Sequence, residues 1–225
     1  MNIQDVMQYE RSALLGESLI ADPISHLTLL PYAAVTDPDV FVRTPTFLRM
    51  RHPVTLQSLG GRPRTSVVIQ TCPSLKYNFL WVHADNDSYR DDYKSFLKEV
   101  HKVSQELPSS IAADHLYNRE RAKEFETPWI RLVLATGPIN SSHGAGYEKS
   151  RTNNGIGAHG RDHKMDEITL MKLCGMPSPR KNQPLTAEMR GHIHKIAGLY
   201  GIPSKEIERN IMELMQVAAF DSNAT

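Results

Sequence analysis

The 225-residue chain has only two cysteines, Cys72 and Cys174, which lie far apart. Neither belongs to a pair with metal-ligand spacing, so we expect two free thiols in a reducing compartment. Long hydrophobic runs are also missing, because the longest, at residues 27–35, is far too short to cross a bilayer. The N-terminus lacks the basic and apolar segments of a secretory signal. These absences predict a cytoplasmic protein that does not engage a membrane.

Neither glycine nor proline is abundant, with 13 and 14 residues respectively, which excludes collagen-like and low-complexity classes. Charge of one sign is not in excess overall, since 26 Lys and Arg face 25 Asp and Glu. The balance hides an asymmetry: residues 1–75 contain no lysine, whereas residues 149–195 contain nine basic and four acidic residues. A local basic excess favours an anionic partner, although a solvated surface produces the same pattern.

The hydrophobic pattern predicts an α+β fold with a small, mostly antiparallel sheet, flanking helices and a helical C-terminal region. We expect a mixed α+β domain over residues 1–150 and a basic linker plus helical region over residues 151–225. The expected strands are 66–71, 78–84 and 129–135, with extended pieces inside the proline-rich stretch 24–64. The expected helices are the first twenty residues, 89–103, a short one at 116–125, and then about 164–174, 186–200 and 204–219.

Residue types that carry catalysis are densest in the centre of the chain. Asp114 and His115 open the expected short helix, and Asn140, His143 and Glu148 follow the strand at 129–135. A carboxylate binds a divalent metal while an adjacent imidazole deprotonates water. The order Asp-His, Asn, then His or Glu resembles that of the ββα-metal nucleases of the HNH type. The resemblance implies Asp114 as a metal ligand, His115 as the general base, Asn140 as a brace, and His143 or Glu148 as the last ligand.

The same residues also allow a purely structural interpretation. An aspartate accepts hydrogen bonds from the free N–H groups at the start of a helix, so Asp114 serves equally well as a cap. Asp85 and Asp87 follow the second expected strand, where turn and cap residues are common. Glu120 and Glu124 then belong to a solvated helix face.

A glycine-rich passage at 141–164 interleaves five glycines with histidine, lysine and arginine. Glycine lets backbone N–H groups approach an anion, and basic side chains supply charge. The passage lacks the GxxxxGK[ST] and GxGxxG patterns of nucleotide-binding loops. We therefore expect a phosphate-contacting loop, with a mobile connector as the alternative. The predicted nucleic-acid contacts are Arg119, Lys149, Arg151, Arg161 and Lys164.

Residues 196–211 have the spacing of a helix-turn-helix unit. Ala197 allows close helix packing, Gly201 follows four residues later at the turn, and Ile207 seats the second helix. That second helix carries Glu206 and Glu208, which are unfavourable next to phosphates. A structural helical hairpin therefore stays open as an alternative to a DNA-reading unit.

Together these patterns predict a nucleic-acid-interacting protein of bacterial or phage origin, with DNA favoured over RNA. If the protein is an enzyme, we expect phosphodiester hydrolysis that depends on Mg²⁺ or Zn²⁺. The alternative is a non-catalytic adaptor that binds DNA, RNA or protein and needs no cofactor. A homo-oligomer or a protein partner is compatible with either.

Overall fold

The computed structural model describes residues 1–21, 31–44, 52–148, 159–180, 183–200 and 203–220. The chain divides into two compact units, which are described separately below. Unit 1 comprises Met1–Ala135 and Gly157–Met165, and unit 2 comprises Thr136–Ile156 and Asp166–Thr225. None of the described helices is both long and apolar enough to span a lipid bilayer.

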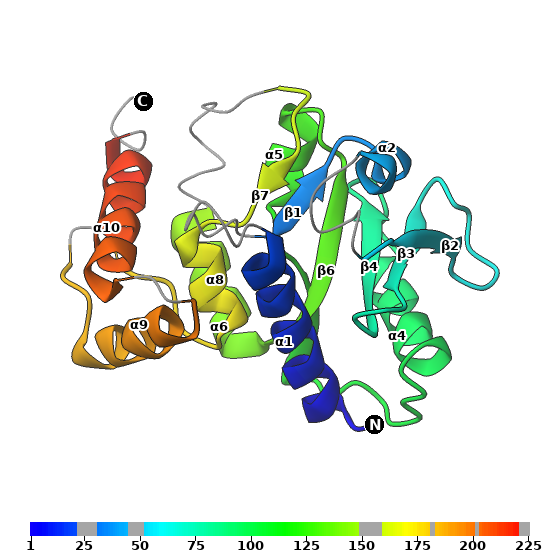
Figure 1. The fold of residues 1–225 in the computed structure, drawn as a ribbon, viewed down its shortest axis with the longest axis horizontal. Helices are drawn as coiled ribbons and strands as arrows, with labels where there is room; N and C mark the ends of the chain where they lie inside the picture. The colour runs from blue at the N-terminus through cyan, green and yellow to red at the C-terminus, as the bar shows by residue number, and fades with distance from the viewer. Residues whose placement is uncertain (22–30, 45–51, 149–158, 181–182, 201–202, 221–225) are drawn as a thin grey trace. The chain divides into compact units, whose positions relative to one another are not determined.

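Unit 1 is built on a sheet whose described strands run in the spatial order β2-β3-β4-β6-β1-β7 (Figure 1). In addition, β5 pairs with β6. Every register resolved along this order is antiparallel. The strands are β1 (Tyr32–Val35), β2 (Thr55–Ser58), β3 (Val67–Cys72), β4 (Tyr77–His83), β5 (Ile111–His115), β6 (Trp129–Thr136) and β7 (His163–Lys164).

The expected hairpin is confirmed by β3 and β4, whose paired residues run from Val67 opposite Val82 to Cys72 opposite Tyr77. Its turn contains Lys76 in the left-handed region at φ 55°. The carbonyl of Lys76 accepts a hydrogen bond from the Tyr9 hydroxyl at 2.6 Å, which ties the turn to the first helix. The strand expected at 129–135 lies in the same sheet, where β6 pairs with β4.

Two helices cover one face of this sheet: α1 (Ile3–Ala21) and α4 (Tyr89–Glu99). Alternation along the strands puts every second apolar residue on this face, where it meets the apolar stripe of α4. Burying each such side chain stabilises the fold by about 1.5–3 kcal/mol. The core residues from the strands are Val67, Ile69, Leu80, Val82, Leu132 and Leu134, and those from α4 are Tyr93, Phe96 and Leu97.

The opposite face carries aromatic residues and one fully buried cation. Arg131 lies between the rings of Phe79 and Trp81, with its guanidinium carbon 4.4 and 4.5 Å from the two ring centroids. Gln70 Oε1 accepts hydrogen bonds from the Trp81 indole at 2.8 Å and from Arg131 at 3.3 Å. The short helix α2 (Pro38–Arg43), which the sequence pattern did not predict, adds Phe41 to this face.

Three expectations about the centre of the chain are wrong. Asp114 and His115 end strand β5 rather than opening a helix, and α5 (Arg119–Glu124) begins four residues later, capped by Asn118. The first part of the glycine-rich passage is a helix, α6 (Gly137–Ala145), which Pro138 starts in its first turn. Its last two residues, His163 and Lys164, pair with β1 as a strand.

Unit 2 is helical in its described part, as expected for the C-terminal region. Besides α6 it contains α8 (Glu167–Leu173), α9 (Ala187–Tyr200) and α10 (Ser204–Phe220). The two long helices bury the apolar residues that the sequence placed at helix-turn-helix spacing, including Ala197, Ile207 and Ile211. Gly201 and Ile202 lie outside the described residues. The helical pair is therefore present, and its use for reading DNA stays a prediction.

Candidate functional site

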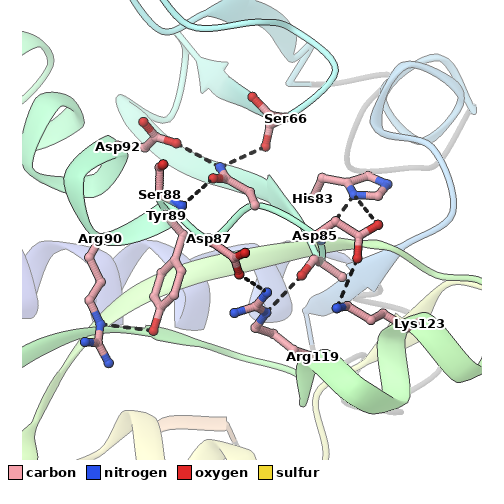
Figure 2. Close-up of polar contacts among 12 residues, drawn as sticks. Ser66, His83, Asp85, Asp87, Ser88, Tyr89, Arg90, Asp92, Arg119 and Lys123 are labelled. Carbon is pink, nitrogen blue, oxygen red and sulfur yellow. Dashed lines mark hydrogen bonds and ion pairs between the residues drawn. The ribbon is translucent and has the colours of Figure 1, made fainter.

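Polar side chains gather where β4 ends and leads into α4, next to α5 (Figure 2). Arg119, at the start of α5, reaches across to this connection and is held at both sides of its guanidinium. Its Nε donates to the Ala84 carbonyl at 2.9 Å, and its terminal nitrogen pairs with the Asp87 carboxylate at 2.9 Å. The guanidinium also lies 5.7 Å from the ring centroid of Tyr89. Arg119 is thus a fixed cation at the surface of unit 1.

A second set of charges lies beside it. The Lys123 ammonium is 3.0 Å from Asp85, and this hydrogen bond and charge lower the pKa of the Asp85 carboxyl. The backbone N–H of Asp85 donates to His83 Nδ1 at 3.3 Å. The same Nδ1 also lies 3.6 Å from the Asp85 carboxylate.

Tyr89 links this surface to the predicted Asp-His pair. The His115 ring packs on Tyr89 with the two centroids 4.4 Å apart. Arg90 donates from its Nε to the Tyr89 hydroxyl at 3.1 Å. The structure therefore brings together two residues that the sequence singled out, His115 and Arg119, through an aromatic side chain that it did not single out.

The connection itself is held by Asn86, which is buried. Its side-chain amide donates to the Ser66 carbonyl at 3.3 Å and to Asp92 at 2.8 Å, and its side-chain oxygen accepts from the Ser88 N–H at 2.9 Å. Asp92 in turn pairs with Arg62 at 2.6 Å. The sequence Asn-Asp-Ser at residues 86–88 predicts a turn and the start of a helix. It does not predict that the Asn86 side chain fixes the connection between β4 and α4.

Asp114 and His115 do not face the same way. Successive side chains of a strand point to opposite faces of the sheet, so the Asp114 carboxylate and the His115 imidazole leave β5 in different directions. Their joint action on a metal-bound water stays a prediction. Both are also only 9% exposed. Ile111 and Ala113 belong to the core under α4, and His115 follows the same alternation toward Tyr89.

The other predicted metal-site residues, Asn140, His143 and Glu148, lie in unit 2. Buried His143 donates from Nε2 to the Met176 carbonyl at 2.8 Å, and burial lowers its pKa to about 4. Glu148 pairs at 2.6 Å with Lys172, whose side chain is almost fully buried. Within the described ranges, no three or more His, Cys, Asp or Glu side chains are grouped so that they could hold a metal ion. Metal-dependent hydrolysis stays a prediction.

The predicted phosphate contacts can be placed in part. Arg161 and Lys164 are exposed in unit 1, and Lys164 lies 5.5 Å from the ring centroid of Tyr32. Lys149 and Arg151 lie outside the described residues.

The segment that carries Arg161 and Lys164 runs directly beside α5. The N–H of Gly160 donates to the Phe125 carbonyl at 2.9 Å, and the His163 ring stacks on Tyr117 with the centroids 4.8 Å apart. Gly160 has φ +62°, which a glycine adopts without strain. Asp162 anchors the segment further by accepting from the Thr36 N–H at 2.9 Å.

Comparisons with known proteins identify no relative: no protein-family model matches the chain, and no curated protein or solved structure shows significant similarity to it.

Proposed function

We propose that the protein binds nucleic acid through a surface of unit 1 formed by α5 and the segment 159–164. We call it the α5–β7 surface and define it by its cations Arg119, Lys123, Arg161 and Lys164. The observation that carries the proposal is the adjacency of these two segments, which are about forty residues apart in the sequence. The Gly160–Phe125 hydrogen bond and the Tyr117–His163 stack hold them together.

The charges of this surface suit a polyanion. Arg161 and Lys164 make no ion pair with any residue that the structure describes. Arg119 and Lys123 are paired, but with Asp87 and Asp85, whose side chains are 89% and 69% exposed. Exposed ion pairs contribute little to stability, so a phosphate replaces either carboxylate at small cost.

The position of β7 adds a second argument. It is the last strand in the order of the described sheet, so its residues lie at an edge. His163 faces Tyr117 on the α5 side, whereas Lys164 lies over Tyr32, next to the core of the other face. A nucleic-acid backbone that runs along this edge contacts cations on both sides of it. Phosphate contacts of this kind position a protein without reading base sequence.

Fluorescence anisotropy with labelled single-stranded DNA, duplex DNA and RNA tests the proposal. The double variant Arg161→Ala/Lys164→Ala removes two cations that form no ion pair within the described residues. Lys94→Ala/Lys98→Ala on α4, which removes the same net charge, is the control. We expect the first variant to bind duplex DNA roughly tenfold or more weakly at low salt, with a salt dependence flatter by about 0.9 in slope for each lost phosphate contact. The control should bind as the parent does. Absence of binding by the parent, or an equal loss in the control, would contradict the proposal.

The hydrolysis hypothesis is tested in the same samples. Mg²⁺ or Zn²⁺ is added and the chain length of the nucleic acid is followed. Cleavage that needs the metal and disappears in His115→Gln, while binding persists, would support His115 as the general base. Binding without cleavage under these conditions would favour the non-catalytic alternative.

A further inference from the structure

Unit 2 contains a pocket of about 700 Å³ that the nucleic-acid proposal does not use. Its volume lies within the usual range of small-molecule sites, roughly 300–1,000 Å³. The lining is largely apolar and includes three methionines, Met176, Met189 and Met215. Methionine side chains are flexible and polarizable, so they adapt to the shape of an apolar ligand.

One wall of the pocket is fixed by hydrogen bonds rather than by loose packing. The segment 176–179 is attached to α6 because His143 donates to the Met176 carbonyl at 2.8 Å and the Ser178 N–H donates to Ser142 Oγ at 3.0 Å. Ser178 Oγ also accepts from the Tyr147 N–H at 3.4 Å. The start of α9 also lines the pocket, and there the Thr186 hydroxyl accepts from the Met189 N–H at 3.2 Å. Such a wall is formed before any ligand arrives, which reduces the entropy lost on binding.

The charged groups that line the pocket indicate which charge a ligand would carry. Arg180 lines it, is exposed, and makes no ion pair with any residue in the described ranges. His192 and Gln183 also line it and are further hydrogen-bond donors. Glu188 is the one carboxylate among the lining residues. An anionic group near Arg180 gains a charge-assisted hydrogen bond, and an apolar chain fills the methionine-lined part.

We propose that this pocket binds a small amphipathic carboxylate, which places its carboxylate at Arg180 and its apolar chain against Met176, Met189 and Met215. The ligand class follows from the volume, the apolar lining and a cation, Arg180, that has no ion-pair partner in the described part of the chain.

Isothermal titration calorimetry with decanoate and with its uncharged analogue decanol tests the site. Arg180→Gln should weaken decanoate binding about tenfold and leave decanol binding unchanged. Glu188→Gln removes a repelling charge, so it should tighten decanoate binding about threefold and again leave decanol unchanged. Ala145→Trp, at an exposed lining position, fills the pocket and should abolish binding of both probes.

Arg209→Gln, on α10 outside the lining, is the control and should bind both probes as the parent does. The parent failing to bind decanoate would overturn the proposal. So would decanoate binding that survives Ala145→Trp in a variant with parental circular dichroism, or an equal effect of Arg180→Gln on the two probes. None of these readouts depends on nucleic acid, so this proposal and the preceding one fail independently.

Discussion

Glu10 is the most deeply buried acidic side chain among the residues that the structure describes. It is 1% exposed, accepts a hydrogen bond from the Tyr93 hydroxyl, and accepts another from the Leu134 N–H at 2.9 Å. Burial raises the pKa of its carboxyl to about 7, although both hydrogen bonds act in the lowering direction. The native state therefore holds a proton that the unfolded chain releases above its ordinary pKa of 4.5.

This difference sets the sign of a pH effect on stability. Because the folded pKa is the higher one, the free energy of unfolding decreases as pH rises from about 4.5 to 7. Glu10→Gln keeps a hydrogen-bonding side chain without an ionisable group. We expect the variant to be more stable than the parent by about 3 kcal/mol at pH 8 and nearly equal to it at pH 4.5. Urea unfolding at both pH values measures this, with Glu106→Gln, an exposed acid, as the control; a variant less stable than the parent at pH 8 would refute the assignment.

The sequence indicates that Glu10 is buried, but it does not indicate which groups Glu10 contacts. Glu10 continues the stripe of Ile3, Val6 and Leu14, so helical periodicity alone indicates an acid on a buried face. Its partners are 83 and 124 residues away, and no local pattern connects them to it. The same holds for Arg131, which reads as a polar interruption of a strand but is enclosed by two aromatic rings.

Among the helices and strands, a strong hydrophobic periodicity is sufficient to predict the element from the sequence, whereas a weak one is not. The strands at 67–72, 77–83 and 129–136 alternate or are continuously apolar, and they pair as predicted. Strand β5 is short and ends in Asp114 and His115, which local propensity assigns to a helix start. Pairing with β6 overrode that propensity, and the real cap is Asn118, whose side chain accepts from the Arg121 N–H at 3.1 Å.

The end of α6 offers a test of close packing that needs no ligand. A Cβ at Gly146 would lie 2.9 Å from Ser178 Oγ and 3.0 Å from the Ser142 carbonyl, both of which belong to the fixed wall of the pocket. Gly146→Ala should therefore destabilise the protein by about 1–3 kcal/mol. Gly144 lies two residues earlier, within α6, with nothing within 4 Å of its Cβ position. Gly144→Ala should be neutral or stabilising by up to about 1 kcal/mol, because alanine favours a helix.

Chemical denaturation followed by circular dichroism compares the two glycine variants under one set of conditions. Gly146→Ala proving as stable as Gly144→Ala would show that the 176–179 segment moves away freely. That result would also mean that the pocket wall formed by this segment is not fixed before a ligand binds.

For the molecule as a whole, composition and periodicity indicated the α+β class and the helical C-terminal region, but not how the chain is shared between the units. The sequence places Arg161 and Lys164 in a basic linker, and the structure groups Gly157–Met165 with unit 1. A two-residue strand such as β7 has too few residues to show alternation, so the sequence pattern does not reveal it. The pairing of β7 with β1 follows from the folded sheet and not from the sequence pattern. The same is true of the α5–β7 surface, which contains β7.

The return of residues 157–165 to unit 1 leads to a prediction about fragments. These residues supply hydrogen bonds from the Gly160 N–H to the Phe125 carbonyl at 2.9 Å and from the Met165 N–H to the Pro31 carbonyl at 2.8 Å. Asp162 accepts two more, from the Thr36 N–H at 2.9 Å and from the Thr36 hydroxyl at 3.0 Å. At about 1 kcal/mol for each of these four bonds, fragment 1–156 should be less stable than fragment 1–165 by roughly 4 kcal/mol.

Thermal unfolding of the two fragments checks this, with Arg161→Ala in fragment 1–165 as a control that leaves all four bonds in place. That control should unfold at the temperature of its parent fragment, whereas fragment 1–156 should unfold at a lower one. The comparison also tests the boundary predicted at 150/151, because a domain that ends there has no need of residues 157–165. Equal midpoints for the two fragments would favour that boundary. A lower midpoint for fragment 1–156 would instead mean that the sheet of unit 1 is complete only after the chain has returned to it.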